Sequence, residues 1–170
     1  MFTAPDPYLN FTMVDTPEGR AGVFHTLRVM RTLVRETRHN PAIVQCAIAA
    51  IYLVPEKNEV GEVSAVFHFV RDSIRYTRDV LGVETISNPV TTLARRVGDC
   101  DDKALLLAAL FESIGYPTRF VVAGYQNNRD FEHVYLQVYT DSGWLDCDPT
   151  ETGEVGDAPG SPLVIFVEKL

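Results

Sequence analysis

The hydrophobic pattern of this chain changes its period once, between Ile114 and Thr118, and no other feature limits the fold as strongly. Before Gly115, apolar residues recur every three or four positions, as on the buried face of a helix. After Pro117 they alternate with polar residues, as in a strand with one buried face. Helices followed by antiparallel strands predict an α+β fold.

Four segments after the change of period are predicted strands, because they alternate and are rich in β-branched and aromatic residues. They are Thr118 to Tyr125, Glu132 to Thr140, Gly143 to Asp148 and Leu163 to Glu168. Asp141, Ser142 and Gly143 suit a hairpin turn between the second and third of them. A connection this short cannot join parallel neighbours, so we expect one antiparallel sheet.

Four helices are predicted before the change of period. They run from about Val23 to Val34, from Pro41 to about Tyr52, from Val63 to Ile74 and from Cys100 to Ile114. Asn40 and Pro41 supply an N-cap and a first-turn residue for the second helix. Because that helix is apolar on nearly all sides, we expect it to be buried.

Charge is distributed unevenly along the chain. In total, 15 Lys and Arg stand against 23 Asp and Glu, which gives a formal net charge of -8. Residues 99–170 carry thirteen of the acids and four basic residues, and a surface this negative repels phosphates. Nucleic acid is therefore not an expected partner. The first helix has the opposite character, and its arginines form a stripe that we expect either to be solvated or to dock on the acidic C-terminal part or on an acidic partner. These are Arg28, Arg31, Arg35 and Arg38.

The remaining composition predicts one domain over residues 1–170, since 46% hydrophobic residues at this length suffice for a core. No apolar run approaches the ~20 residues that span a bilayer, and MFTAPDPYLN lacks a signal core, so we expect a cytoplasmic protein without a membrane span. The three cysteines lack disulfide or zinc-ribbon spacing. Of these, Cys46 and Cys147 are expected to be structural thiols.

Strand alternation decides which side chains share a face. His133, Tyr135 and Gln137 are expected on one face of their strand, and Trp144, Asp146 and Asp148 on one face of the next. A hairpin then places His133 opposite Asp146 or Asp148. Cys100 is expected in the first turn of its helix, where the helix dipole and unpaired amides favour a thiolate.

A thiol, an imidazole and a carboxylate in this arrangement are the parts of a nucleophilic site. A free thiol has a pKa of ~8.5 and is mostly protonated at neutral pH, so a partner imidazolium and the helix terminus are needed to hold the sulfur as a thiolate. A carboxylate on the far side of the imidazole fixes its tautomer and supports its positive charge. Cys100, His133 and either Asp148 or Asp146 meet this requirement.

Three blocks of the sequence resemble the transglutaminase-like superfamily, in that family's order. They are Gly98 to Arg119, His133 to Tyr139, and Gly143 to Thr150, and the matching region spans about residues 67–150. Residue by residue, the resemblance implies that Cys100 is the nucleophile, His133 the base and Asp148 the orienting carboxylate. It also implies a papain-like core, in which a cysteine opens the central helix against an antiparallel sheet. Similar small domains occur among phage and prophage proteins.

The resemblance implies acyl transfer through a thioester, and hydrolysis of a peptide or amide is our first expectation. The substrate is then a peptide or a protein, and no cofactor is required. One alternative is a transglutaminase that joins glutamine carboxamides to amines. An alternative of another class is a binding or assembly module that has kept the fold without activity. The oligomeric state is left open.

Several residues around these blocks carry two interpretations. Asp99, Asp101 and Asp102 are expected to cap the helix and complement its dipole, in preference to forming a calcium site, so no metal is predicted. If they lie close to Cys100 they also raise the pKa of its thiol. Trp144 and Tyr135 are expected to line a substrate cleft or else to pack. The Cys100 amide is one expected oxyanion donor, and Tyr76 is a guess for the second.

Overall fold

In the computed structural model, residues 19–78, 85–126, 131–150 and 152–170 are described, and the N-terminal segment on which the signal-peptide prediction rests lies outside them. The helices of this part of the chain are α1 (Arg20–Thr37), α2 (Pro41–Ile51), α3 (Glu59–Ser73), α4 (Pro89–Arg95) and α5 (Cys100–Ser113). The strands are β1 (Arg75–Tyr76), β2 (Val97–Gly98), β3 (Thr118–Gly124), β4 (His133–Thr140), β5 (Gly143–Cys147) and β6 (Val164–Lys169). The predicted α+β order is confirmed.

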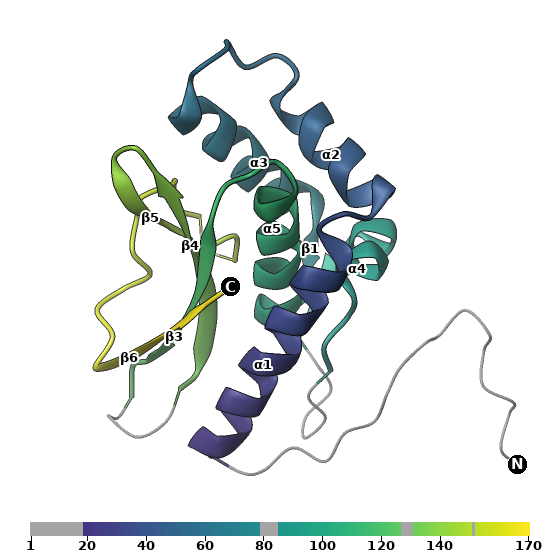
Figure 1. Cartoon of the computed structure of the whole chain (residues 1–170). Coiled ribbons are helices and arrows are strands. Elements are labelled where there is room, and N and C mark those ends of the chain that lie inside the picture. The colour runs from purple at the N-terminus through teal and green to yellow at the C-terminus, as the bar shows by residue number, and fades with distance from the viewer. Residues whose placement is uncertain (1–18, 79–84, 127–130, 151) are drawn as a thin grey trace, which may run out of the picture.

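The helix α5 is the centre of the molecule. Every residue from Asp102 to Phe111 is buried, as its nearly continuous apolar sequence requires. The helices α1 to α4 all contact α5, and strands β3 and β4 cover its other side. Figure 1 shows α5 between the sheet and the α1, α2 and α4 helices. The element that begins with Cys100 is thus held from all sides.

The four strands after Pro117 form one antiparallel sheet in the order β5-β4-β3-β6, as predicted. The β4–β5 pairing places Gln137 opposite Asp146 and Tyr139 opposite Trp144. Residues of β4 that alternate with these, Val134, Leu136 and Val138, are buried in the main core. Side chains therefore sort onto the two faces as the sequence alternation predicts.

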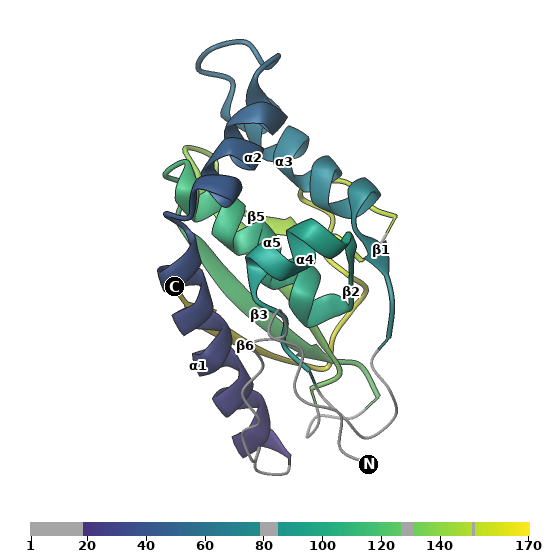
Figure 2. The same ribbon diagram turned by 90° about the vertical axis from the view of Figure 1, so that its right-hand side faces the viewer.

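The basic stripe of α1 divides between the two interpretations. Arg31 pairs with Glu168 of β6 at 2.7 Å, and Arg38 pairs with Glu112 near the end of α5 at 3.3 Å. Arg28 and Arg35 are exposed. Figure 2 shows α1 beside β6, where Phe24 also packs on Phe166 with ring centroids 4.7 Å apart. Two arginines thus dock α1 onto the acidic C-terminal part, and two are solvated.

The expectation of a buried α2 is wrong. Asn40 caps this helix by accepting a hydrogen bond from the Ala42 amide, as predicted, but only Ile43 and Ala47 are buried. Ile48 on the opposite side is 52% exposed. The helix lies at the periphery and packs through one side, on α3, α4 and α5, so its apolar outer side stays in solvent. Apolar composition predicts that a helix can be buried and does not supply the neighbours that would bury it.

Three short elements were not predicted from the sequence. The helix α4 begins with Asn88 and Pro89, the same cap and first-turn pair that marks α2, so its start could have been found. The strands β1 and β2 have two residues each and pair in parallel, Tyr76 opposite Gly98. The strand β2 leads directly into α5, so its pairing with β1 holds Tyr76 beside the residues that precede Cys100.

Within the described ranges, no helix is long and apolar enough to cross a bilayer.

Candidate active site

Cys100 is the first residue of α5 and is held there by the turn from β2. Asp99 is the N-cap, and its side chain accepts a hydrogen bond from the Asp102 amide at 3.1 Å. Gly98 packs so closely that an added Cβ would lie 2.6 Å from the Cβ of Asp102. A side chain at this position would displace the start of the helix, so Gly98 is the residue that the tight turn requires.

The Cys100 thiol is partly buried between α5 and β4. The Val134 backbone amide donates a hydrogen bond to the sulfur and lowers the pKa of the thiol. Burial, followed by the charges of Asp101 and Asp99, acts more strongly and raises the pKa above its ordinary value. The sulfur also lies 3.6 Å from Asp101 Oδ1. Burial and, after it, the acidic neighbours that the sequence singled out thus hold the pKa of the Cys100 thiol above its ordinary value.

His133 and Asp148 form a close pair. His133 Nε2 lies 2.5 Å from Asp148 Oδ2, and Asp148 is almost fully buried. The other carboxylate oxygen, Oδ1, accepts hydrogen bonds from the Thr150 amide at 3.0 Å and the Thr150 hydroxyl at 2.6 Å. Both oxygens are thus oriented, and the carboxylate meets one chosen nitrogen of the ring.

The structure separates the two aspartates that the sequence left as alternatives. Asp146 accepts a hydrogen bond from Gln137 Nε2 at 2.7 Å, whereas Asp148 accepts the contact with His133. The Cys100 sulfur is bound by the amide of Val134, which directly follows His133 in the chain. The start of β4 therefore carries both the His133–Asp148 pair and the amide that binds the Cys100 sulfur.

The two predicted substrate-lining aromatics lie at different places. Tyr135 is buried, and its ring stacks on His133 with centroids 6.2 Å apart and planes 18° apart. Trp144 is paired with Tyr139 of β4. Tyr139 lies six residues after His133, which corresponds to about 20 Å along an extended strand. The Trp144 ring lies 4.1 Å from the guanidinium of Arg119. The structure brings Tyr135 to His133 and does not bring Trp144 there.

The three aspartates around Cys100 have separate contacts. Asp99 caps α5, Asp101 lies beside the sulfur, and buried Asp102 accepts a hydrogen bond from the Ser87 amide at 2.7 Å. In the described part of the chain, no group of three or more His, Cys, Asp or Glu side chains is arranged to hold a metal ion. Capping is therefore observed for Asp99, and Asp102 ties the segment before α4 to α5.

Tyr76 lies close enough to Cys100 and Asp99 for them to affect the pKa of its phenol. Burial, and then the charges of Cys100 and Asp99, raise the pKa of its phenol. Its position follows from the β1–β2 pairing, which sets Tyr76 opposite Gly98, two residues before Cys100. The short parallel pairing thus explains why a tyrosine distant in sequence lies near the thiol.

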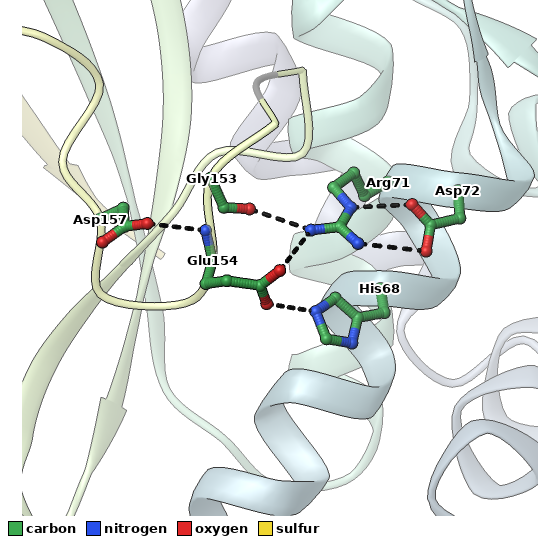
Figure 3. Close-up of polar contacts among 6 residues, drawn as sticks. All are labelled: His68, Arg71, Asp72, Gly153, Glu154 and Asp157. Carbon is green, nitrogen blue, oxygen red and sulfur yellow. Dashed lines mark hydrogen bonds and ion pairs between the residues drawn. The ribbon is translucent and has the colours of Figure 1, made fainter.

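Sequence reasoning missed a charged cluster behind the site. Lys103, three residues after Cys100, is 3% exposed, and its Nζ donates a hydrogen bond to the Arg71 carbonyl at 3.1 Å. The Arg71 side chain reaches the segment after β5, where it donates to the Gly153 carbonyl and to Glu154, both at 3.0 Å (Figure 3). A lysine on the apolar side of a predicted central helix was the available signal for this cluster.

Comparison with known proteins gives a family and several structural neighbours. The model of the transglutaminase-like superfamily matches residues 47–149, which is more than half of the chain. No curated protein matches the sequence.

Three solved structures share the fold. A candidate cysteine protease from Cytophaga hutchinsonii has a TM-score of 0.57 at 17% identity, over 82% of this chain and 50% of that one. A candidate protease from Parabacteroides distasonis has a TM-score of 0.63 at 12% identity, over 98% and 34%. Calcium-bound LapG from Legionella pneumophila has a TM-score of 0.57 at 18% identity, over 84% and 87%. This chain thus spans half or less of the first two proteins, and identities this low establish the fold alone.

Proposed function

Because the chain belongs to the transglutaminase-like superfamily, we propose that it is a thiol-dependent hydrolase of peptides or amides, with Cys100 as nucleophile, His133 as base and Asp148 as orienting carboxylate. The observation that carries the proposal is the His133–Asp148 pair at 2.5 Å, next to the amide that binds the Cys100 sulfur. Cys100 opens α5, His133 opens β4 and Asp148 directly follows β5, so the proposed triad draws on three separate parts of the chain.

The resting thiol decides how the reaction begins. Because the pKa of Cys100 is raised, the proposed mechanism does not start from a thiolate–imidazolium pair. His133 instead removes the thiol proton as a general base while the sulfur attacks. Asp148 occupies Nε2, so Nδ1 is the nitrogen that takes the thiol proton. In this mechanism the Cys100 sulfur and Nδ1 lie within about 4 Å of each other once substrate is bound.

In both acylation and deacylation, the imidazole of His133 carries the proton that is transferred. The sulfur bonds to the carbonyl carbon, and the negative oxygen is stabilised by the Cys100 amide, which as the first of α5 has no carbonyl partner within the helix. The carbon–nitrogen bond breaks, and His133 gives its proton to the leaving amine or ammonia. Water, deprotonated by His133, attacks the thioester, and the carboxylic acid leaves as Cys100 regains its proton.

Water is the proposed acyl acceptor. The acidic C-terminal part attracts cationic amines and raises their encounter rate, but attraction does not keep water away from a thioester. With a glutamine-containing peptide, the expected product is therefore the deamidated or hydrolysed peptide, even with a primary amine in excess.

The test is a product analysis by mass spectrometry in water labelled with ¹⁸O. Wild-type protein should release peptide carrying one labelled oxygen, and Cys100→Ser should not. Cys46→Ser is the matched control, since it removes a thiol from α2, outside the site, and should act like wild type. Amine incorporation that exceeds hydrolysis and depends on Cys100 would make the protein a transglutaminase. Absence of any product that depends on Cys100, across a library of amide substrates, would favour a silent binding module.

A further inference from the structure

The proposed base, His133, has an aromatic ring beside it on its own strand. His133 and Tyr135 are alternate residues of β4, so their side chains stand next to each other on one face of the sheet. Their ring centroids lie 6.2 Å apart and their planes are inclined by only 18°. This is an offset, nearly parallel stack, an arrangement that aromatic rings favour. The flat face of Tyr135 therefore bounds the imidazole on one side.

The position of Tyr135 is fixed by contacts on two neighbouring strands. Tyr135 is 3% exposed, whereas the side chain of His133 is 17% exposed. Tyr135 packs in a small buried cluster with Val121 and Ala123 of β3, and Val121 is its partner in the β3–β4 register. Its hydroxyl is hydrogen-bonded to the Asp146 carboxylate of β5. The phenol ring cannot turn away from His133 without losing these contacts.

The segment after β5 holds this cluster from the outside. Tyr125 packs on the cluster, and its hydroxyl donates a hydrogen bond to the Pro159 carbonyl at 2.7 Å. The Gly156 amide donates to the backbone carbonyl of Asp146 at 2.8 Å. Figure 3 shows the beginning of the same segment, where side chains of α3 bind both carboxylate oxygens of Glu154. The aromatic ring beside the imidazole is thus fixed by parts of the chain outside the proposed triad.

We propose that Tyr135 is a positioning residue for the proposed hydrolysis: its ring is a fixed wall that holds the His133 imidazole in one orientation. In that orientation Nε2 meets Asp148 and Nδ1 faces Cys100, as the proposed mechanism requires. The inference rests on the proposed function and adds one residue to it. The contact with Asp148 fixes one atom of the imidazole, and the terminal torsion of a histidine has only broad preferences, so the ring can still rock about that atom. A flat neighbour on one face restricts this motion.

The sequence also allowed Tyr135 to line a substrate cleft or simply to pack. Its burial leaves almost no surface for a substrate. A lining residue would change KM, and a packing residue would change Tm alone. A positioning residue acts on kcat and on the motion of the imidazole, because only the orientation of the base is altered. These readouts separate the three roles.

The test measures the motion of the His133 ring by ¹³C NMR relaxation in wild-type protein and in variants of Tyr135. Tyr135→Phe keeps the ring and loses the hydroxyl, whereas Tyr135→Leu and Tyr135→Met keep apolar bulk and lose the ring. The order parameter of the imidazole should be high in wild type and in Tyr135→Phe, and lower in the other two. Tyr139→Leu is the matched control, since it changes an exposed tyrosine on the same face of β4 and should leave the His133 ring as in wild type.

The same variants should also differ in steady-state kinetics. We expect kcat to fall about tenfold in Tyr135→Leu and Tyr135→Met, with KM changed by less than about twofold. In Tyr135→Phe and Tyr139→Leu, kcat should stay within about twofold of wild type, because the ring beside His133 is kept. Circular dichroism checks that each variant is folded.

A folded Tyr135→Leu or Tyr135→Met with an unchanged His133 order parameter and kcat would overturn the proposal and leave Tyr135 as a packing residue. A change in KM alone would make it a substrate-lining residue. If neither variant folds, a mobile His133 ring in wild type contradicts the wall, and a rigid ring in both wild type and Tyr135→Phe supports it. If wild type shows no hydrolysis that depends on Cys100, the proposed function fails, and the ring motion still decides whether Tyr135 positions His133.

Discussion

The two ends of the β4–β5 hairpin look alike in sequence and differ in structure. At one end, His133 meets Asp148, and the amide of the next residue, Val134, binds the Cys100 sulfur. At the other end, Tyr139 packs on Trp144 with ring centroids 5.1 Å apart. Both ends carry polar and aromatic side chains, and the first also carries the residues that we propose for catalysis.

The far end also has a hollow of about 340 Å³, which is lined in part by Glu59, Glu62 and Asp141. Its polar groups are used within the fold. Glu62 accepts a hydrogen bond from the Tyr116 hydroxyl at 2.6 Å, and Glu59 accepts one from the Asp141 amide at 2.9 Å. A hollow with acids and tyrosines is therefore not by itself a site for acyl transfer, and the nucleophile distinguishes the two ends.

The largest expected difference between the ends comes from one substitution at each end of β4. His133→Ala removes the proposed base and should lower kcat/KM by at least about 10³-fold, whereas Tyr139→Ala should change it less than about threefold. The measurement is steady-state hydrolysis of the best peptide amide, with circular dichroism to confirm folding. Equal losses in both variants would remove the distinction between the ends.

The next largest difference is expected between substitutions of Asp148 and Asp146, the two aspartates that the sequence left as partners of His133. Asp148→Asn loses the charge that supports the imidazolium and should lower kcat by about 10²- to 10⁴-fold. Asp146→Asn disturbs the bond to Gln137 and should cost about 1 kcal/mol of stability with little change in kcat. Kinetics and urea unfolding of both variants test this. A larger kcat loss for Asp146→Asn would move the orienting role to that residue.

Thiol reactivity should also distinguish Cys100 from the other two cysteines of the chain. Cys100 should react with iodoacetamide near neutral pH at least about tenfold faster than Cys46 or Cys147, because it alone has His133 as a neighbouring base. Burial raises the pKa of all three thiols, so the expected difference rests on the proposed base His133. Peptide mapping of the labelled, folded protein measures the three rates. His133→Ala should slow Cys100 toward the others, and similar rates for all three in wild type would contradict the assignment.

The smallest expected effect concerns the anchor of the segment after β5. His68 and then Arg71 lower the pKa of Glu154, so this group stabilises the fold above its unfolded pKa, and the contribution is lost as the pH falls through the folded value. Glu154→Gln should therefore lower Tm slightly at pH 7 and leave it unchanged below about pH 3. Thermal unfolding at both values checks this, and a Tm decrease of equal size at low pH would assign the effect to something other than charge.

Local sequence patterns predicted what local interactions decide. The strand alternation predicted that His133 faces Asp146 or Asp148, and the helix pattern predicted Cys100 in the first turn of its helix. The structure pairs His133 with Asp148, directly after β5, and begins α5 at Cys100. Composition could not predict which sides of α2 have neighbours, so Ile48 was wrongly expected to be buried. Lys103 and Arg71 were missed for a similar reason, since their partners come from elements far apart in the sequence.

The placement of Trp144 shows the limit of alternation most clearly. It shares a strand face with Asp146, as predicted, but its register partner is Tyr139, at the end of the hairpin away from His133. A shared face fixes the side of a sheet and leaves the distance along the strand open. Pairing register, and not residue type, decides which aromatic of the hairpin lies beside His133.

The most direct test of the central claim is intact-protein mass spectrometry after rapid acid quenching of a reaction with a reactive peptide amide. The account predicts a peptidyl adduct on wild-type protein, mapped to Cys100 and decaying as the hydrolysed peptide appears. The adduct should be absent from Cys100→Ala and should decay more slowly in Asp148→Asn. Turnover by wild-type protein with no adduct on Cys100, or with one on Cys46 or Cys147, would contradict it.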